Sequence, residues 1–195
     1  MGNRAKLLGS ALELFNDQGT RAVSTNHIAK AAEVSPGNLY YHFKNKGEII
    51  RHLFIEFSTG CSQAIPQSEP PLIGSIEQMN QFLGQIKKIE WRYRFFGREM
   101  GSLLDIDPEL RVLFLEVQSA RLSMIEGSIR GMIHGGLAVD LDEQTIQRLA
   151  EMIWLVSVFW NPYLALKGES ITEERMAESG EMVKMLVAPY LIHPQ

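Results

Sequence analysis

The sequence predicts an all-α protein of about nine helices. Apolar residues recur every three or four positions almost throughout its 195 residues, and no segment alternates polar and apolar residues for long. Residues that typically start and end helices separate these periodic segments. We expect a small three-helix N-terminal unit over residues 1–50 and a larger helical body over residues 51–195, with a long fourth helix that connects them.

The first helix has one apolar face and a clear end. Leu8, Leu12 and Phe15 recur at helical spacing, with Ala11 beside them. Gly19 is of the residue type that most often follows the last turn of a helix. We therefore expect this helix to bury one face and to stop at Gly19.

Two short helices with matching start signals are expected within residues 23–43. Ser24 is the predicted N-cap of the first, and Ser35, followed by Pro36 at the first helical position, is the predicted N-cap of the second. Two helices of this length joined by a short turn form a helix-turn-helix. Their shared core with the first helix is expected to contain Leu12, Phe15, Ile28, Val34, Leu39 and Phe43.

The fourth helix is expected over residues 46–60, where apolar residues are closely spaced. Residues 66–71 contain three prolines, so this stretch cannot be helical and is the clearest linker. Ser75 with Gln78 is a capping box that starts the next helix.

The remaining helices are also marked by their caps. A 27-residue helix should begin at Asp107-Pro108 and end at His134, before two glycines. Asp140 or Asp142 caps the next helix, which Asn161-Pro162 should end or kink. A last helix is expected over about residues 172–189.

Composition and charge restrict the classes of function that we expect for this protein. Seven Lys and Arg against four Asp and Glu give residues 1–53 a net charge of +3, whereas the whole chain carries −4, so one end is suited to a polyanion. The single cysteine excludes an internal disulfide, and scattered histidines offer no metal site. The N-terminus has no export signal, and the longest apolar run is half a membrane span. We expect a cytoplasmic protein without metal, cofactor or membrane partner.

The outer face of the second short helix suits DNA. Backbone amides at residues 35–38 could meet a phosphate, and Asn38 could meet a base edge. Tyr41 and His42 could reach phosphates or a thymine methyl, with lysines nearby for the backbone. Capped helix pairs also occur in proteins that do not bind DNA. We expect the side chain of Tyr40 to pack against the domain and not to contact DNA. The candidate DNA-binding residues are Thr25, Ser35, Pro36, Gly37, Asn38, Tyr41, His42, Lys44 and Lys46.

The run from Arg4 to Leu53 resembles the DNA-binding domain of the tetracycline-repressor (TetR) family. The resemblance rests on the first helix, Ser24-Thr25 before Ile28-Ala29, Val34-Ser35-Pro36-Gly37, Leu39-Tyr40-Tyr41-His42-Phe43, and Lys46. One departure is Glu33, where the family usually has glycine in the turn, so this turn should be strained or altered. Beyond residue 53 the resemblance is architectural, so it implies a helical ligand-binding and dimerisation domain but no particular ligand.

An aromatic-rich segment over residues 91–104 has two interpretations. Its aromatic residues could form packed core, with the arginines as a solvated face, which is the commoner case. The resemblance implies instead a cavity in the helical body, for which aromatic and methionine side chains make adaptable walls. The candidate pocket residues are Phe95, Phe96, Met100, Leu103, Phe114, Val117, Arg121, Met124 and Trp154.

Residues 146–160 contain more apolar residues than one packed helix face requires, and the last helix is similarly apolar. The resemblance implies that these two helices pair with their copies in a homodimer through residues 142–190. The alternative is that they fill the core of a single chain.

The predicted function is that of a homodimeric transcriptional regulator, acting as a repressor that a small, largely apolar effector releases from a palindromic double-stranded DNA operator. No nucleophile elbow, phosphate-binding loop or metalloprotease motif indicates an enzyme. Three alternatives remain: an activator, a regulator gated by a protein partner, and a helical ligand-binding or scaffolding protein with a vestigial helix-turn-helix.

Overall fold

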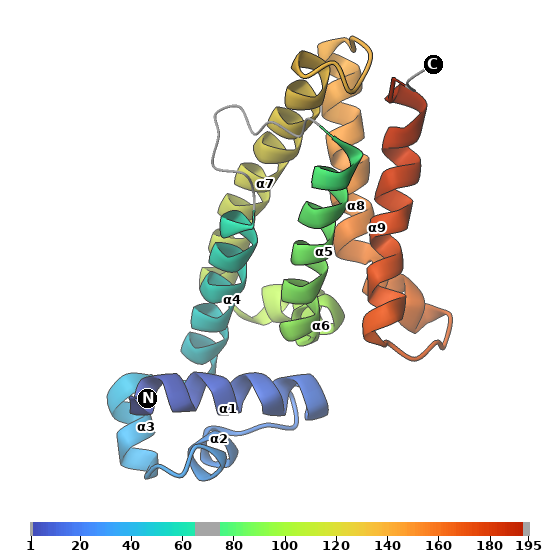
Figure 1. The fold of residues 1–195 in the computed structure, drawn as a ribbon. Coiled ribbons are helices and arrows are strands. Elements are labelled where there is room, and N and C mark those ends of the chain that lie inside the picture. Colours follow the sequence, from blue (N-terminus) through green and yellow to red (C-terminus); the bar gives the residue numbers. More distant parts are fainter. Residues whose placement is uncertain (1, 65–74, 193–195) are drawn as a thin grey trace. The chain divides into compact units, whose positions relative to one another are not determined.

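The computed structural model describes residues 2–64 and 75–192, and within these residues the chain forms nine α-helices and one short 3-10 turn (Figure 1). The only β-pairing described there is an isolated bridge between Ala138 and Leu191. The predicted linker at residues 66–71 lies outside the described residues. The helices are α1 (Asn3–Gln18), α2 (Thr25–Ala31), α3 (Pro36–His42), α4 (Lys46–Gln63), α5 (Ile76–Arg92), α6 (Arg94–Ile106), α7 (Pro108–His134), α8 (Glu143–Leu166) and α9 (Glu173–Val187).

The all-α fold class with about nine helices is confirmed, and the predicted caps are where the sequence places them. Ser75 accepts the amide of Gln78 at the start of α5, and Asp107 accepts the amide of Leu110 at the start of α7. Between the two aspartates considered for α8, Asp142 is the N-cap, since its side chain accepts from the amide of Thr145.

The chain divides into two compact units, and each of them combines stretches that are distant in the sequence. The first unit combines Met1–Thr59 with Arg92–Leu113, so it contains α1–α3, most of α4, α6 and the start of α7. The second combines Gly60–Trp91 with Phe114–Gln195. Helix α6, which is distant in the sequence, therefore belongs with the helix-turn-helix.

The core of the first unit is aromatic. Phe15 of α1 lies 5.3 Å from Phe95 of α6 between ring centroids, and Phe54 of α4 lies 5.5 Å from Phe96. These four side chains are buried. Gly19, which ends α1 with φ +81°, packs against α6 so closely that a Cβ there would lie 3.0 Å from Oε1 of Glu99. The predicted stop at Gly19 is confirmed.

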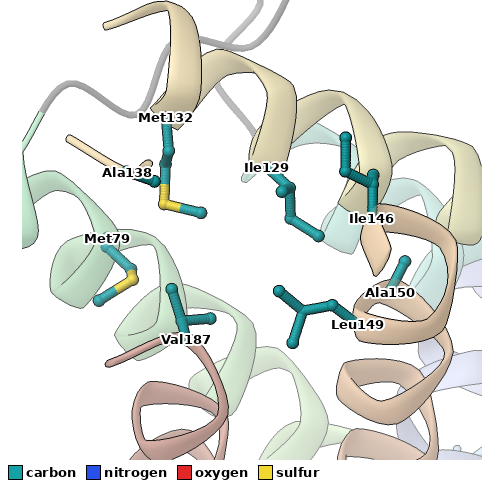
Figure 2. Packing of buried hydrophobic residues seen from close by; sticks show 8 residues of the cluster. All are labelled: Met79, Ile129, Met132, Ala138, Ile146, Leu149, Ala150 and Val187. Carbon is teal, nitrogen blue, oxygen red and sulfur yellow. The ribbon is translucent and has the colours of Figure 1, made fainter. Parts of the chain in front are cut away.

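The core of the second unit is assembled from α5, α7, α8 and α9. Figure 2 shows side chains from these helices, and from the loop after α7, pointing toward one another. Burying aliphatic and methionine side chains in this way is the main contribution to the stability of a helical unit. The eight residues drawn are Met79, Ile129, Met132, Ala138, Ile146, Leu149, Ala150 and Val187.

Helix α8 is longer than the sequence predicted. It continues through Pro162 to Leu166, so of the two effects expected of Asn161-Pro162 the end of the helix is wrong, and the kink stays a prediction. With 24 residues, α8 contains a stretch that is long and apolar enough to cross a membrane, by length and composition alone. The sequence analysis counted only the near-continuous apolar run within this helix, which is about half a membrane span.

One side of α8 carries a row of exposed apolar residues, which we call the α8 seam. Its members are spaced three or four residues apart and therefore lie along one stripe of the helix. They are between 47% and 88% exposed. The α8 seam consists of Met152, Leu155, Phe159, Tyr163 and Leu166.

Helix α9 contributes less exposed apolar surface than expected. Met176 and Val183 are buried within the chain, and Met182 and Leu186 are partly buried. Met185 is exposed. For most of the apolar residues of α9, packing in a single chain is therefore the correct interpretation.

Candidate DNA-binding interface

Helices α2 and α3 form the helix-turn-helix predicted from their caps. The hydroxyl of Ser24 accepts the amide of His27 at 3.2 Å, and the Ser24 amide in turn donates to Nδ1 of His27 at 3.4 Å. The hydroxyl of Ser35 accepts the amide of Asn38 at 3.2 Å at the start of α3. Both helices lie against α1 (Figure 1), and Ile28 and Leu39 are fully buried beneath them.

Helix α3 has one buried face and one bare face. Leu39 is 0% exposed, whereas Tyr41, two residues further on, is 83% exposed. The rings of Tyr41 and His42 meet edge to face with centroids 5.1 Å apart, which forms an aromatic and polar tip. Ser35, Pro36, Gly37 and Lys44 are also exposed. This surface has the groups that phosphates and base edges require.

Tyr40 is not the packing residue that the sequence suggested. Its side chain is 53% exposed, and its hydroxyl lies 3.1 Å from the hydroxyl of Thr25. The two groups join the start of α2 to the middle of α3. Tyr40 therefore belongs to the same polar surface as Thr25, which the sequence did identify.

Two residues that were expected to contact DNA are partly buried in the chain. The ammonium of Lys46 donates to the carbonyls of Thr20 and Val23 at 2.6 and 2.8 Å, so it fixes the loop before α2. The Oδ1 atom of Asn38 is buried and has no hydrogen-bond partner among residues 2–64 and 75–192, so it cannot meet a base edge unless the side chain turns. The backbone amide of Asn38 donates to the hydroxyl of Ser35. These arrangements depend on tertiary contacts that helix spacing does not reveal.

A polar network fastens α1 and its following loop to α6. The carboxylate of Glu99 accepts the amide and the hydroxyl of Thr20 at 2.9 and 2.6 Å. The side chain of Asn16 donates to the carbonyl of Arg92 and accepts the amide of Phe95. Burial raises the pKa of the Glu99 carboxyl, but the hydrogen bonds from Thr20 and Arg98 outweigh it, and the net pKa is lowered. Glu99 is therefore held as a charged carboxylate.

Comparison with known proteins assigns the chain to a family. The tetR family of bacterial regulatory proteins matches residues 7–53, which contain the helix-turn-helix just described. A second family description, a bacterial transcriptional repressor of the TetR type, matches residues 57–195. The chain belongs to the TetR family. The resemblance seen in the first fifty residues thus extends over the helical body, and the chain is a DNA-binding transcriptional regulator.

Individual TetR-family proteins also match this chain, two of them over most of its length. A solved TetR-family regulator from Marinobacter aquaeolei is 34% identical, with a TM-score of 0.88, covering 98% of this chain and 92% of that one. The repressor KstR2 of Mycolicibacterium smegmatis is 25% identical over 89% of this chain and 87% of its own. The regulator YttP of Bacillus subtilis is 30% identical, but the match spans only 54% of its length.

Glu33 departs from the TetR-family pattern in the way the sequence predicted. Its φ of +56° places a non-glycine residue in the left-handed region. The amide of Val34 donates to the carbonyl of Ala29, and that of Glu33 to the carbonyl of Lys30, which is the hydrogen-bond pattern of a Schellman cap on α2. This cap favours glycine, because a Cβ is strained there.

We expect Glu33→Gly to raise the free energy of unfolding by about 0.5–1 kcal/mol, since the relief of strain exceeds the added freedom of the unfolded chain. Urea unfolding measures it. Glu33→Ala is the matched control, because it removes the carboxylate and keeps the Cβ. An equal gain in both variants would show that charge, not backbone conformation, is responsible.

His52 of α4 joins α1 to the end of the recognition helix. The Arg4 guanidinium lies 3.0 Å from Nδ1 of His52 and also covers the ring of Phe43, which packs edge to face on His52. Because a guanidinium can only donate, Nδ1 must accept and the imidazole is neutral. Burial lowers the pKa of His52 below 6.5, and Arg4 lowers it further, against the opposing charges of Glu48 and Glu56.

A lowered folded-state pKa makes this contact acid-sensitive. The unfolded chain binds more protons near pH 6, so the contribution of His52 to stability is complete above pH 6.5 and is lost as the pH falls through the folded pKa. We expect wild-type protein to lose up to about 1 kcal/mol more than His52→Gln between pH 7.5 and 5, a small effect because Arg4 is exposed and His52 is only partly buried. Thermal melts test this. His134→Gln should behave like wild type; a matching change there would remove His52 as the cause.

The nine predicted pocket residues do not all share one environment. Phe95, Phe96 and Leu103 are buried in the core of the first unit, as the packed-core interpretation expected. In the second unit, the rings of Phe114 and Trp154 lie 6.3 Å apart between centroids, and both side chains are partly buried. The other four, Met100, Val117, Arg121 and Met124, are partly buried. A pocket at these residues remains a prediction.

Proposed function

We propose that this TetR-family regulator is a cytoplasmic homodimer that represses transcription by binding a palindromic operator and dissociates when a small molecule binds its helical body. The observation that carries the DNA-binding part is the contrast along α3. Leu39 is buried beneath the helix, while Tyr41 is exposed at its tip with the partly buried His42 ring packed against it. A helix held by one buried side while its other side is exposed can enter the major groove without unfolding its own domain.

Different residues of the polar surface can contact phosphates and bases. Thr25 and Tyr40, with their paired hydroxyls, suit a phosphate beside α2, and Lys44 adds an exposed cation next to α3. Arg21 and Lys30 are two further exposed cations near α2 that spacing alone did not single out. Sequence readout is then left to the tip of α3.

The α8 seam supports the homodimer. Five large apolar side chains on one stripe form a surface that a soluble protein normally covers, and the three-and-four spacing suits pairing with a second helix. A two-fold dimer through α8 would give two recognition helices, which palindromic DNA requires about 34–36 Å apart.

Selection of bound DNA from a random pool by the full chain tests this function. We expect enrichment of inverted half-sites whose centres lie about 10–10.5 base pairs, or a multiple of that, apart. Enrichment of an unpaired single half-site would contradict the dimer, and no enrichment at all would contradict specific DNA binding.

A further inference from the structure

Helices α5 and α9 line a half-open groove in the second unit that shares no residue with the predicted pocket. Its cavity has a volume of about 270 Å³, which suits a small metabolite better than a drug-sized ligand. Each helix contributes residues from one face, at spacings of three and four. The lining residues are Asn80, Leu83, Gly84, Lys87, Lys88, Glu173, Ala177, Gly180, Glu181 and Lys184.

The floor of the groove is open because two glycines line it. Gly180 is buried, and yet a Cβ built on it would meet no atom within 4 Å. Gly84 on α5 is exposed, and a Cβ built on it would likewise meet no atom within 4 Å. With Ala177 and Leu83 beside them, these glycines leave an apolar slot into which a flat or chain-like group can lie.

The charges around the slot leave one cation available. Lys87, whose side chain is 9% exposed, pairs with Glu90 at 2.7 Å, and Lys184 pairs with Glu181 at 2.7 Å. Lys88 is exposed and has no carboxylate within 4 Å in the part of the chain that the structure describes. Lys88 can therefore receive an anion.

Glu173 limits how much negative charge the groove accepts. It lies in the first turn of α9, where the helix dipole stabilises a carboxylate. It also lines the cavity, so a dianion would be repelled while a single carboxylate near Lys88 is tolerated.

We propose that the groove is the effector site and that its ligand is a small organic monoanion, with its carboxylate at Lys88 and its apolar body over Gly84 and Gly180. The effector role rests on the proposed ligand-gated function; the binding site does not. Helix α5 leads into α6 through the single residue Tyr93, and α6 carries Glu99, which holds Thr20. A ligand that favours one position of α5 changes DNA affinity by its differential affinity for the two states.

Calorimetric titration of the full chain at low salt tests the site with benzoate, phenylacetate and hexanoate as probes. Benzamide is the neutral control for benzoate. We expect at least one carboxylate to bind, and benzoate to bind at least tenfold more tightly than benzamide. Lys88→Gln should abolish that preference. No binding of any of the three carboxylates, or equal binding of benzoate and benzamide, would overturn the proposal.

Two glycine variants locate the binding. Gly84→Leu should fill the slot and abolish binding, whereas Gly101→Leu, at another helical glycine with open space around it, should leave it unchanged. Binding that survives Gly84→Leu would overturn the location. Should Gly84→Leu fail to fold, the charge test with Lys88→Gln still decides.

The effector role has a separate readout. If the carboxylate that binds also lowers operator affinity, and Lys88→Gln prevents this, the groove is the effector site. If it binds and operator affinity does not change, the binding site stands and its effector role is overturned. A chain that binds no operator in the absence of probe would instead contradict the proposed function.

Discussion

Phe159→Asp is expected to convert the protein from a dimer to a monomer and to weaken operator binding by about 100-fold or more. Phe159 lies in the middle of the α8 seam and is 57% exposed in the single chain. A carboxylate buried there without a partner would oppose association. Two linked recognition helices gain affinity because they bind the operator at the same time. Separating the two chains removes that gain.

Sedimentation and DNA binding of the same samples check this result. Ile106→Asp is the matched control, because it makes the same change at an apolar residue that is 77% exposed and outside the α8 seam. The control should remain dimeric. A dimer that persists in Phe159→Asp, or a wild-type monomer that binds operator tightly, would contradict the assembly proposed here.

Leu39→Ala and Tyr41→Ala are expected to have opposite effects. Leu39 is fully buried, so its truncation should destabilise the DNA-binding unit by about 2–5 kcal/mol. Tyr41 is 83% exposed, so its truncation should change the free energy of unfolding by less than about 0.5 kcal/mol. Operator affinity should nevertheless fall about tenfold or more, because Tyr41 is at the tip of the recognition helix.

Urea unfolding and operator titration of both variants separate the two faces of α3. Gly9→Ala, at an exposed position of α1 with open space around it, controls for the effect of handling a variant. Equal losses of stability in Leu39→Ala and Tyr41→Ala would show that the assignment of the two faces is wrong.

Local signals in the sequence predicted the elements well because caps act within a few residues. Ser24, Ser35 and Asp142 each accept an amide three residues further on, and such contacts are readable from spacing. The strained turn at Glu33 was predictable for the same reason, since the requirement for a positive φ is local.

Contacts between distant segments were not predictable in this way. Lys46 meets carbonyls 23 and 26 residues away, and Glu99 meets Thr20 across 79 residues. Nothing in helical periodicity distinguishes a lysine that points to a phosphate from one that fixes a loop. The extension of α8 through Pro162 likewise differs from what the local preference of proline predicts.

Aromatic residues were ambiguous for a related reason. Phe95 and Phe96 are equally suited to the wall of a cavity and to a packed core, and only the arrangement around Phe15 and Phe54 decides between them. The groove between α5 and α9 could not be predicted from the sequence, because the glycines that line it have no special spacing.

The most direct test of the central claim is the equilibrium affinity of the full chain for a duplex carrying the selected operator, compared with a scrambled duplex of equal length. We predict two chains per operator duplex, binding at least about 10³-fold tighter than to the scrambled sequence, and a steep loss of affinity as salt rises. Equal affinity for the two duplexes, or binding that does not respond to salt, would contradict a DNA-binding regulator built on the surface of α3.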